Sequence, residues 1–252
     1  MSVSVVVPVY NSAATLVQLV LELKAALSSV TEDFEVILVN DGSKDLSWHV
    51  ISDISQNESF ITAINLSRNY GQQNALLCGV RAATKKVIVT IDDNLQNPPT
   101  EISKLLSELN NGHDVVYGVP EKEAHGFLRD ISSLITKVVL QKAMGAEVAR
   151  NISSFRAFRT NLREAFAGYN NSAVCLDIIL TWATDRFSAI RVKHAPRNAG
   201  SSNYTLAKLI THAGNLITGF SVVPFGKQLQ STLNIMADAI LPKWNYVLSP
   251  QT

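Results

Sequence analysis

Residues 3–40 of the chain read VSVVVPVYNSAATLVQLVLELKAALSSVTEDFEVILVN. The stretch opens and closes with short β-branched runs, Ser4–Val9 and Glu35–Asn40, that are apolar almost throughout. Such runs are typical of parallel strands covered on both faces. Between them, Ala13–Ser29 has apolar side chains at helical spacing, and Ser12 is a candidate N-cap for this helix. The stretch therefore predicts a strand–helix–strand unit, the building block of an α/β fold.

The same alternation continues to about residue 117. Further strands are expected at Ile61–Leu66, Val87–Ile91 and Asp114–Tyr117, and further helices at Leu46–Ser55, Gln72–Ala83 and Thr100–Asn110. Beyond residue 118 the pattern loosens. There we expect helices at Phe127–Met144, Thr160–Ala167 and Asp177–Ala183, an extended segment at Asn151–Arg159 and a strand at Ser188–His194. The predicted fold class is α/β, a mostly parallel sheet with helices on both faces.

The last part of the chain has a different character. Thr205–Thr218 carries an apolar face and is predicted to be an amphipathic helix, and Trp244 and Tyr246 follow it. No stretch of about 18 uninterrupted apolar residues exists, so we predict no membrane-spanning helix. We divide the chain into a sheet domain, residues 1–204, and an amphipathic helical extension, residues 205–252. The extension fits contact with a membrane surface or an ordinary packed C-terminal helix.

The charge balance limits the classes of binding partner that the chain is expected to have. The 252 residues carry 22 Lys+Arg and 21 Asp+Glu, a net +1, so nothing favours nucleic acid. From Arg186 onward there are seven basic side chains and one acidic one, a local +6, whereas residues 1–185 carry −5. This basic end is either ordinary surface or a face for anionic lipid or a phosphorylated substrate. The two cysteines, Cys78 and Cys175, and the absence of a basic leader indicate a cytoplasmic protein.

Polar clusters follow three of the predicted strands. They are Pro8-Val9-Tyr10-Asn11, Asn40-Asp41-Gly42-Ser43 and Asp92-Asp93-Asn94-Leu95-Gln96. Any one of them is explained as a turn or a helix cap. Ligands of open α/β sheets bind beyond the carboxyl ends of the strands, however, and three clusters at one edge favour a binding site there.

The third cluster offers oxygen ligands. Asp92, Asn94 and Gln96 alternate, so their side chains converge on one hard cation if the segment is extended, and Asp93 then points elsewhere. Mg²⁺ or Mn²⁺ held this way would bridge the phosphates of a nucleotide diphosphate and stabilise it as a leaving group. No Gly-x-Gly-x-x-Gly follows the first strand and no Gly-x-Ser-x-Gly is present, which argues against a dinucleotide-binding protein and a serine hydrolase.

These clusters, together with Asn69-Tyr70-Gly71 and the continuation Asn97-Pro98-Pro99, resemble the successive motifs of family 2 glycosyltransferases. The branch they resemble comprises dolichyl-phosphate mannose synthases and undecaprenyl-phosphate sugar transferases. Three later segments are similar to the same branch: Ile152–Arg156, Arg197–Tyr204 and Thr218–Pro224. The resemblance runs in the right order over roughly residues 3–225.

The resemblance implies a GT-A (Rossmann-like) fold and an inverting transfer of a sugar from a nucleotide diphosphate to a polyprenyl phosphate, as in cell-envelope glycan biosynthesis. It implies Mg²⁺ or Mn²⁺ as cofactor and a place on the inner face of a membrane. By position, the nucleotide would be bound by Pro8, Tyr10, Asn11, Asp41 and Asp92. The metal ligands would be Asp92, Asn94 and Gln96.

The resemblance also implies catalytic residues. Arg129 and Ser133 resemble residues that bind the acceptor phosphate, and Arg197 resembles an arginine on the donor phosphates. Asp93 and Asp177 complete the set, although Asp177 also fits a helix cap. A phosphate monoester is anionic near neutral pH, with a second pKa of about 6. As a nucleophile it needs positioning and charge neutralisation, and it needs no strong base.

Two departures keep alternatives open. Asn94 stands where relatives carry Asp, which removes one charge from the metal site unless Asp93 compensates. Gly118-Val119-Pro120 stands where relatives often have Gly-x-Arg, with Lys122 as a possible substitute. The alternatives are a family 2 transferase with a saccharide or protein acceptor, and a catalytically silent nucleotide-sugar-binding protein. UDP is the first expectation for the nucleotide, with GDP and dTDP open, and the sequence predicts neither the sugar nor the oligomeric state.

Overall fold

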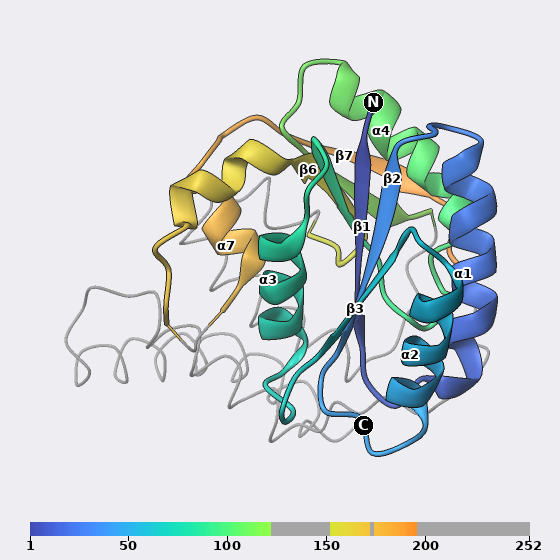
Figure 1. Ribbon diagram of the computed structural model, residues 1–252. Coiled ribbons are helices and arrows are strands. Elements are labelled where there is room, and N and C mark those ends of the chain that lie inside the picture. The colour runs from blue at the N-terminus through green and yellow to red at the C-terminus, as the bar shows by residue number, and fades with distance from the viewer. Residues whose placement is uncertain (122–151, 172–173, 196–252) are drawn as a thin grey trace, which may run out of the picture. The chain divides into compact units, whose positions relative to one another are not determined.

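The computed structural model describes residues 1–121, 152–171 and 174–195, which hold one layered α/β arrangement (Figure 1). The strands are β1 Val3–Val9, β2 Phe34–Asn40, β3 Ile61–Asn65, β4 Val87–Thr90, β5 Val115–Pro120, β6 Arg156–Arg159 and β7 Phe187–Val192. The helices are α1 Ala13–Ser28, α2 Ser47–Asn57, α3 Gln72–Ala82, α4 Ile102–Asn110 and α7 Leu176–Leu180. Two 3₁₀ segments, η1 Pro99–Glu101 and η2 Thr160–Phe166, complete the described elements.

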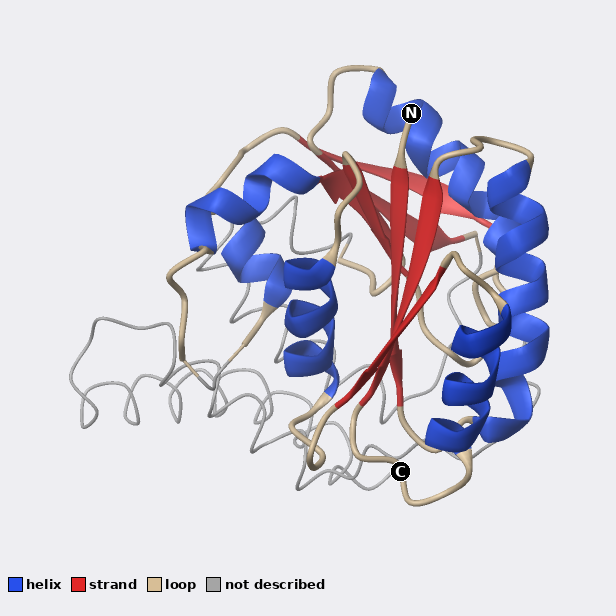
Figure 2. Cartoon of the chain, in the orientation of Figure 1, coloured by secondary structure: helices blue, strands red, loops and turns tan. Residues whose placement is uncertain are grey.

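The strands form one mixed sheet in the order β3-β2-β1-β4-β6-β5-β7, drawn in red in Figure 2. Strands β3, β2, β1 and β4 run parallel, and β5 runs parallel to β7. Strand β6 is antiparallel to both of its neighbours, β4 and β5. The predicted mostly parallel sheet is therefore confirmed, with one reversed strand inserted between β4 and β5.

Helices cover both faces of the sheet, as predicted. Figure 1 shows α1, α2 and α4 on one side of the strands and α3 and α7 on the other. All seven residues of β1 are buried, because alternate side chains of a strand point to opposite faces and both faces are covered here. Val5 and Val7 belong to the large core cluster that includes Leu16 and Leu19 of α1.

Helix α3 lies unusually close to β1 at Gly79. A Cβ at this position would stand 2.4 Å from Val6 Cγ1 and 3.1 Å from Val39 Cγ2, both on buried strand residues. We expect Gly79→Ala to destabilise the fold, because overpacking costs roughly 1–3 kcal/mol. That cost exceeds the helix propensity that alanine adds, which is at most about 1 kcal/mol. Urea denaturation measures the difference in the free energy of unfolding.

Gly168 provides the matched control, because a Cβ there would meet no atom within 4 Å. Gly168→Ala should change the free energy of unfolding by no more than about 0.5 kcal/mol. A Gly79→Ala protein as stable as the wild type would contradict this close packing of α3 on β1.

The differences from prediction lie in the second half of the described chain. The helix expected over Thr160–Ala167 is the 3₁₀ segment η2, and Thr160 Oγ1 donates to Lys85 O there at 2.5 Å. The helix expected at Asp177–Ala183 is the shorter α7, and β7 lies over Phe187–Val192 instead of Ser188–His194. The predicted helices Phe127–Met144 and Thr205–Thr218 and the extension 205–252 lie outside the described residues, so the domain division remains a prediction.

Within residues 1–121, 152–171 and 174–195, no helix combines the length and the apolar character that crossing a bilayer requires.

Candidate functional site

The three polar clusters meet at one edge of the sheet, as the sequence predicts. They follow β1, β2 and β4, which are adjacent and parallel in the order β2-β1-β4. Hydrogen bonds join the loops directly. The Asn11 side chain accepts from Lys44 N at 2.7 Å, and the Asp93 carboxylate accepts from Tyr10 N at 3.1 Å. Pro8 itself is buried inside β1, where it pairs with Val39 of β2, and it lies two residues before the loop.

The β1–α1 loop, residues 10–12, and Ala13 at the start of α1 use their backbone amides inside the protein. These four consecutive N–H groups each donate to a side chain from the loop after β4, from the loop after β2 or from the start of α2. The acceptors are, in order, Asp93 Oδ2 at 3.1 Å, Ser43 Oγ at 3.0 Å, Ser47 Oγ at 2.8 Å and Asp45 Oδ2 at 3.1 Å. Hydrogen bonds from these four amides to a ligand phosphate would have to replace bonds that are already made.

Ser12 stands at the N-cap position of α1, but its side chain makes no capping bond. The predicted N-cap position is therefore confirmed, but the hydroxyl does not make the expected capping bond. The hydroxyl instead donates to Asp93 Oδ2 at 2.5 Å. Of the first amides of α1, Ala13 N donates to Asp45 Oδ2 at 3.1 Å and Thr15 N donates to the Ser12 carbonyl at 3.0 Å.

Asp41, at the end of β2, is 2% exposed and holds the β3–α3 loop. Its two carboxylate oxygens accept from Tyr70 N at 2.7 Å and Gly71 N at 2.9 Å. Burial raises the pKa of Asp41, and these two amide bonds offset part of that rise. The motif Asn69-Tyr70-Gly71, to which the sequence assigns no role, thus positions this acid.

Gly42 explains how close the two loops come. Its φ is +63°, and a Cβ there would lie 2.5 Å from the backbone of Arg68 and of Asn69. Only glycine fits a left-handed residue against a neighbouring backbone. The glycine after Asp41 is thereby required by the packing of the β3–α3 loop.

Asp92, at the end of β4, is held by two neutral donors. Its Oδ1 accepts from Gln72 Nε2 at 2.7 Å, and its Oδ2 accepts from Ser154 Oγ at 2.7 Å. A carboxylate offers about four lone-pair sites, so it can accept several hydrogen bonds or metal contacts at once. Sequence reasoning assigned no role to Gln72 or Ser154, although Ser154 belongs to the motif Ile152–Arg156.

Asp93 turns away from Asp92 and into the β1–α1 loop. Burial raises its pKa to about 6, the bonds from Ser12 and Tyr10 lower it in part, and the charge of Asp92 raises it further. Its backbone carbonyl accepts from Thr15 Oγ1 at 2.7 Å. Asp93 was expected to point elsewhere in an extended segment, and here its carboxylate faces the β1–α1 loop from a turn.

The segment 92–96 is a turn, and the expected extended arrangement of Asp92, Asn94 and Gln96 is wrong. Leu95 has a φ of +59° and its side chain is buried, which reverses the chain between the two amide residues. As a result Asn94 Oδ1 accepts from Gln96 N at 3.0 Å, and Asn94 Nδ2 donates to Gln96 Oε1 at 2.9 Å. This local pattern is an Asx turn.

The donor set still suits a hard divalent cation. Carboxylate and amide oxygens are the ligands that Mg²⁺ and Mn²⁺ prefer, and Asp92, Asn94 and Gln96 supply them from one turn. Only Asp92 among them carries a charge. Among the described residues no group of three or more His, Cys, Asp or Glu side chains is arranged to hold a metal.

Asp177 lies in a buried ion pair. Arg156 Nη1 donates to Asp177 Oδ1, and the Tyr117 hydroxyl donates to the same oxygen at 3.0 Å. Arg156 is 1% exposed and Asp177 4% exposed. The N-cap of α7 is Cys175, so the interpretation of Asp177 as a helix cap is wrong. Burial and the neighbouring Asp177 charge hold the pKa of Tyr117 well above its usual value.

A chain of hydrogen bonds links this ion pair to Asp92. Arg156 Nε donates to Thr90 Oγ1 at 3.2 Å, and Thr90 Oγ1 donates to the Ser154 carbonyl at 2.6 Å. The Ser154 hydroxyl then donates to Asp92. The orientation of the Asp92 carboxylate therefore depends on hydrogen bonds that reach the buried Arg156.

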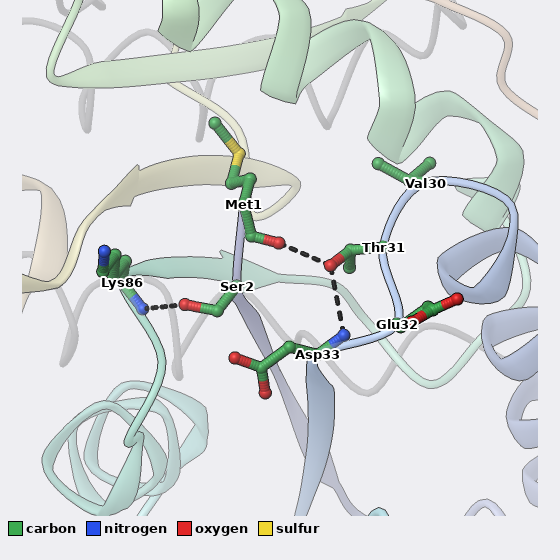
Figure 3. A pocket seen from close by; sticks show the side chains of 7 residues that line it. All are labelled: Met1, Ser2, Val30, Thr31, Glu32, Asp33 and Lys86. Carbon is green, nitrogen blue, oxygen red and sulfur yellow. Dashed lines mark hydrogen bonds between the residues drawn. The ribbon is translucent and has the colours of Figure 1, made fainter.

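A hollow drawn in Figure 3 lies away from this edge. It is lined by Met1, Ser2, Val30, Thr31, Glu32, Asp33 and Lys86, residues next to the amino ends of β1, β2 and β4. None of the candidate residues contributes to it. Of these candidates, Arg129, Ser133 and Arg197 lie outside the described residues, as does Lys122.

Comparison with known proteins agrees with the family resemblance seen in the sequence motifs. The sequence model of Glycosyl transferase family 2 matches residues 4–166. The undecaprenyl-phosphate 4-deoxy-4-formamido-L-arabinose transferase of Yersinia enterocolitica is 35% identical over 223 residues, which cover 88% of this chain and 68% of that protein.

Two solved structures show the same fold at low sequence identity. One is the glucosyl-3-phosphoglycerate synthase of Mycobacterium tuberculosis in complex with Mn²⁺, UDP and phosphoglyceric acid. It has a TM-score of 0.62 and 18% identity, over 92% of this chain and 78% of that one. The other is S. aureus TarS 1–349, with a TM-score of 0.55 and 17% identity, over 95% of this chain and 81% of that one. Both likenesses support the predicted fold class.

Proposed function

This chain belongs to glycosyl transferase family 2, and we propose that it transfers a sugar from a nucleotide diphosphate sugar to a polyprenyl phosphate, with inversion at the sugar carbon. The observation that carries the choice of acceptor is the 35% identity, over 88% of this chain, with an undecaprenyl-phosphate sugar transferase. A saccharide or protein acceptor has no comparable support.

The nucleotide part of the donor is proposed to bind at the sheet edge, against Tyr10, Asn11, Asp41 and Asp92. Each Asp41 oxygen accepts one backbone N–H and has a lone pair left for an N–H of the base. The M. tuberculosis synthase of the same fold was crystallised with UDP, which supports UDP as the first nucleotide to test.

The donor phosphates are proposed to lie over the turn 92–96. Asp92, Asn94 and Gln96 would hold Mn²⁺ or Mg²⁺, and the bound cation would neutralise charge on the departing diphosphate. Gln72 and Ser154 keep the Asp92 carboxylate oriented toward this task. Ala195 N donates to Gln96 O at 2.8 Å, so the chain passes the turn two residues before Arg197. We assign Arg197 to the donor phosphates on the resemblance of its motif, Arg197–Tyr204.

The acceptor phosphate needs no strong base from the protein in order to react. An oxygen of the acceptor phosphate attacks the anomeric carbon, and the bond from that carbon to the diphosphate oxygen breaks with its electron pair leaving on the diphosphate. The acceptor monoester is already anionic, since its second pKa is about 6. The protein has to position the phosphate and balance its charge, and we assign this to Arg129 and Ser133.

The acceptor's prenyl chain resides in a bilayer, so we propose that the enzyme works at the cytoplasmic face of a membrane. The net charge of +6 from Arg186 onward supports attraction to anionic lipid.

The test is a transfer assay with undecaprenyl phosphate and UDP-, GDP- and dTDP-sugars in the presence of Mn²⁺. We expect a lipid-linked sugar from one nucleotide class, and loss of turnover when EDTA removes the metal. Undecaprenol without its phosphate is the matched control and should yield no product. Turnover with a soluble saccharide but not with the lipid phosphate would replace this acceptor with the alternative one.

A catalytically silent nucleotide-sugar-binding protein is the second candidate, because Asn94 leaves the turn with one carboxylate among its three proposed ligands. The same assay decides between the two candidates. Nucleotide binding without turnover on any acceptor would favour the silent protein, and recovery of turnover in Asn94→Asp would locate the cause in this turn.

A further inference from the structure

The carboxylate of Asp93 accepts hydrogen bonds from the loop that precedes α1. Oδ2 accepts from Tyr10 N at 3.1 Å and from Ser12 Oγ at 2.5 Å. The Asp93 carbonyl accepts from Thr15 Oγ1 at 2.7 Å. Three residues of the β1–α1 region therefore bind one residue of the loop after β4, more than 75 positions later in the chain.

The opposite side of the β1–α1 loop is held just as firmly. Asn11 N donates to Ser43 Oγ at 3.0 Å, and Asn11 Oδ1 accepts from Lys44 N at 2.7 Å. Asn11 has a φ of +55°, a left-handed conformation that asparagine tolerates better than most residues. The loop thus has one defined shape, fixed between the loops that follow β2 and β4.

This arrangement limits how the loop can contact a nucleotide. Its amides at residues 10–13 already donate to protein side chains, so its contribution to binding falls to the side chains of Tyr10 and Asn11. The position of those side chains depends on where the loop is held. Asp93 is the point at which the loop is joined to the turn that carries Asp92, Asn94 and Gln96.

We infer that Asp93 is a positioning residue, which acts through Tyr10 N–H and the Ser12 hydroxyl to hold the nucleoside-contacting loop in register with the metal-binding turn. This inference rests on the proposed function, because it supposes a nucleotide donor. It differs from a direct role of Asp93 as metal ligand or base. What the loop requires from residue 93 is a hydrogen-bond acceptor, and an amide supplies one.

The inference is tested by calorimetric titration of UDP, GDP and dTDP, each with Mn²⁺, into the wild type, Asp93→Ala, Asp93→Asn and Ser12→Ala. Asp93→Ala removes both bonds and should weaken binding of the preferred nucleotide by roughly 10- to 100-fold, since small misplacements of binding groups carry penalties of this size. In Asp93→Asn the amide oxygen can take the place of Oδ2 and still accept from both Tyr10 N and Ser12 Oγ. This variant should bind within about 3-fold of the wild type.

Steady-state kinetics give a second readout. We expect Asp93→Ala to raise the KM for the nucleotide sugar by a similar roughly 10- to 100-fold while kcat changes less. Ser12→Ala loses one of the two bonds and should fall between the wild type and Asp93→Ala. If Asp93→Ala does not fold, the binding and KM of Ser12→Ala test the inference in its place. Asp53→Ala is the control, because this acid lies on the exposed side of α2, with a side chain 65% exposed.

Three results would overturn the inference. If Asp93→Ala and Ser12→Ala each bind the nucleotide as tightly as the wild type, the proposed function stands and Asp93 has no positioning role. If Asp93→Asn is as impaired as Asp93→Ala, the charge itself acts and positioning is the wrong description. A wild type that binds none of the three nucleotides would overturn the proposed function, and the inference with it.

Discussion

Replacing Asp92 by asparagine is expected to lower kcat of sugar transfer by about 10²–10³-fold, a typical loss when one group that stabilises transition-state charge is removed. Asp92 is the only charged side chain among the three proposed metal ligands of the turn, so this change leaves only neutral oxygens. The fold should persist. The new amide can face Ser154 with its nitrogen and accept from Gln72 with its oxygen, which replaces both bonds of the carboxylate.

The comparison that isolates this effect is a second Asp→Asn exchange at an exposed position. Asp53→Asn, on α2, removes the same charge from a side chain that is 65% exposed. Its kcat and KM should match the wild type. We further expect high Mn²⁺ concentrations to restore part of the activity of Asp92→Asn. Full activity of Asp92→Asn at low Mn²⁺ would contradict the assignment of this turn to the metal.

Breaking the buried ion pair should cause the largest loss of stability. Arg156→Met leaves Asp177 buried without a counter-charge, and removing one partner of such a pair costs about 3–5 kcal/mol. The double variant Arg156→Met/Asp177→Leu leaves no lone charge and should recover most of this loss. Urea denaturation of the three proteins measures each free energy of unfolding.

An exposed ion pair provides the reference. Lys24 and Glu58 lie 2.8 Å apart with side chains 46% and 31% exposed, and such pairs contribute about 0–1 kcal/mol. Lys24→Met should therefore cost far less than Arg156→Met. Equal losses in the two variants would mean that Arg156 and Asp177 are solvated, contrary to their burial. Because Asp177 supports the fold, the activity of any Asp177 variant has to be compared at equal fractions of folded protein.

The first half of the fold was predictable because its signals are local. Strands β1 to β4 and helices α1 to α3 each show a clear period of apolar residues, and the predicted bounds differ from the observed ones by few residues. Strand β6 lies at the end of the predicted extended segment Asn151–Arg159 but shows no such period. It contains only four residues, two of them arginine, and its place between β4 and β5 does not follow from its order in the chain.

The sequence predicted which loops form the candidate site, but it did not predict the contacts between their side chains. Acids after buried strands mark the edge of the sheet, and the structure brings them together there. Their partners were not predictable, because Gln72 meets Asp92 and Arg156 meets Asp177 only through tertiary folding. The shape of the turn 92–96 was missed for a different reason. Leu95 adopts a positive φ, which a bulky side chain rarely does and which no sequence pattern announces.

The reversed strand β6 has a consequence for how the protein is made. Arg156 pairs with Thr90 across the sheet, but the ribosome synthesises it 66 residues later. At roughly 5–20 residues per second, a nascent chain waits several seconds with one edge of β4 unpaired. An open edge of this kind is a template for pairing with other chains. Protection of the nascent β4 edge by a chaperone should therefore raise the yield of folded protein.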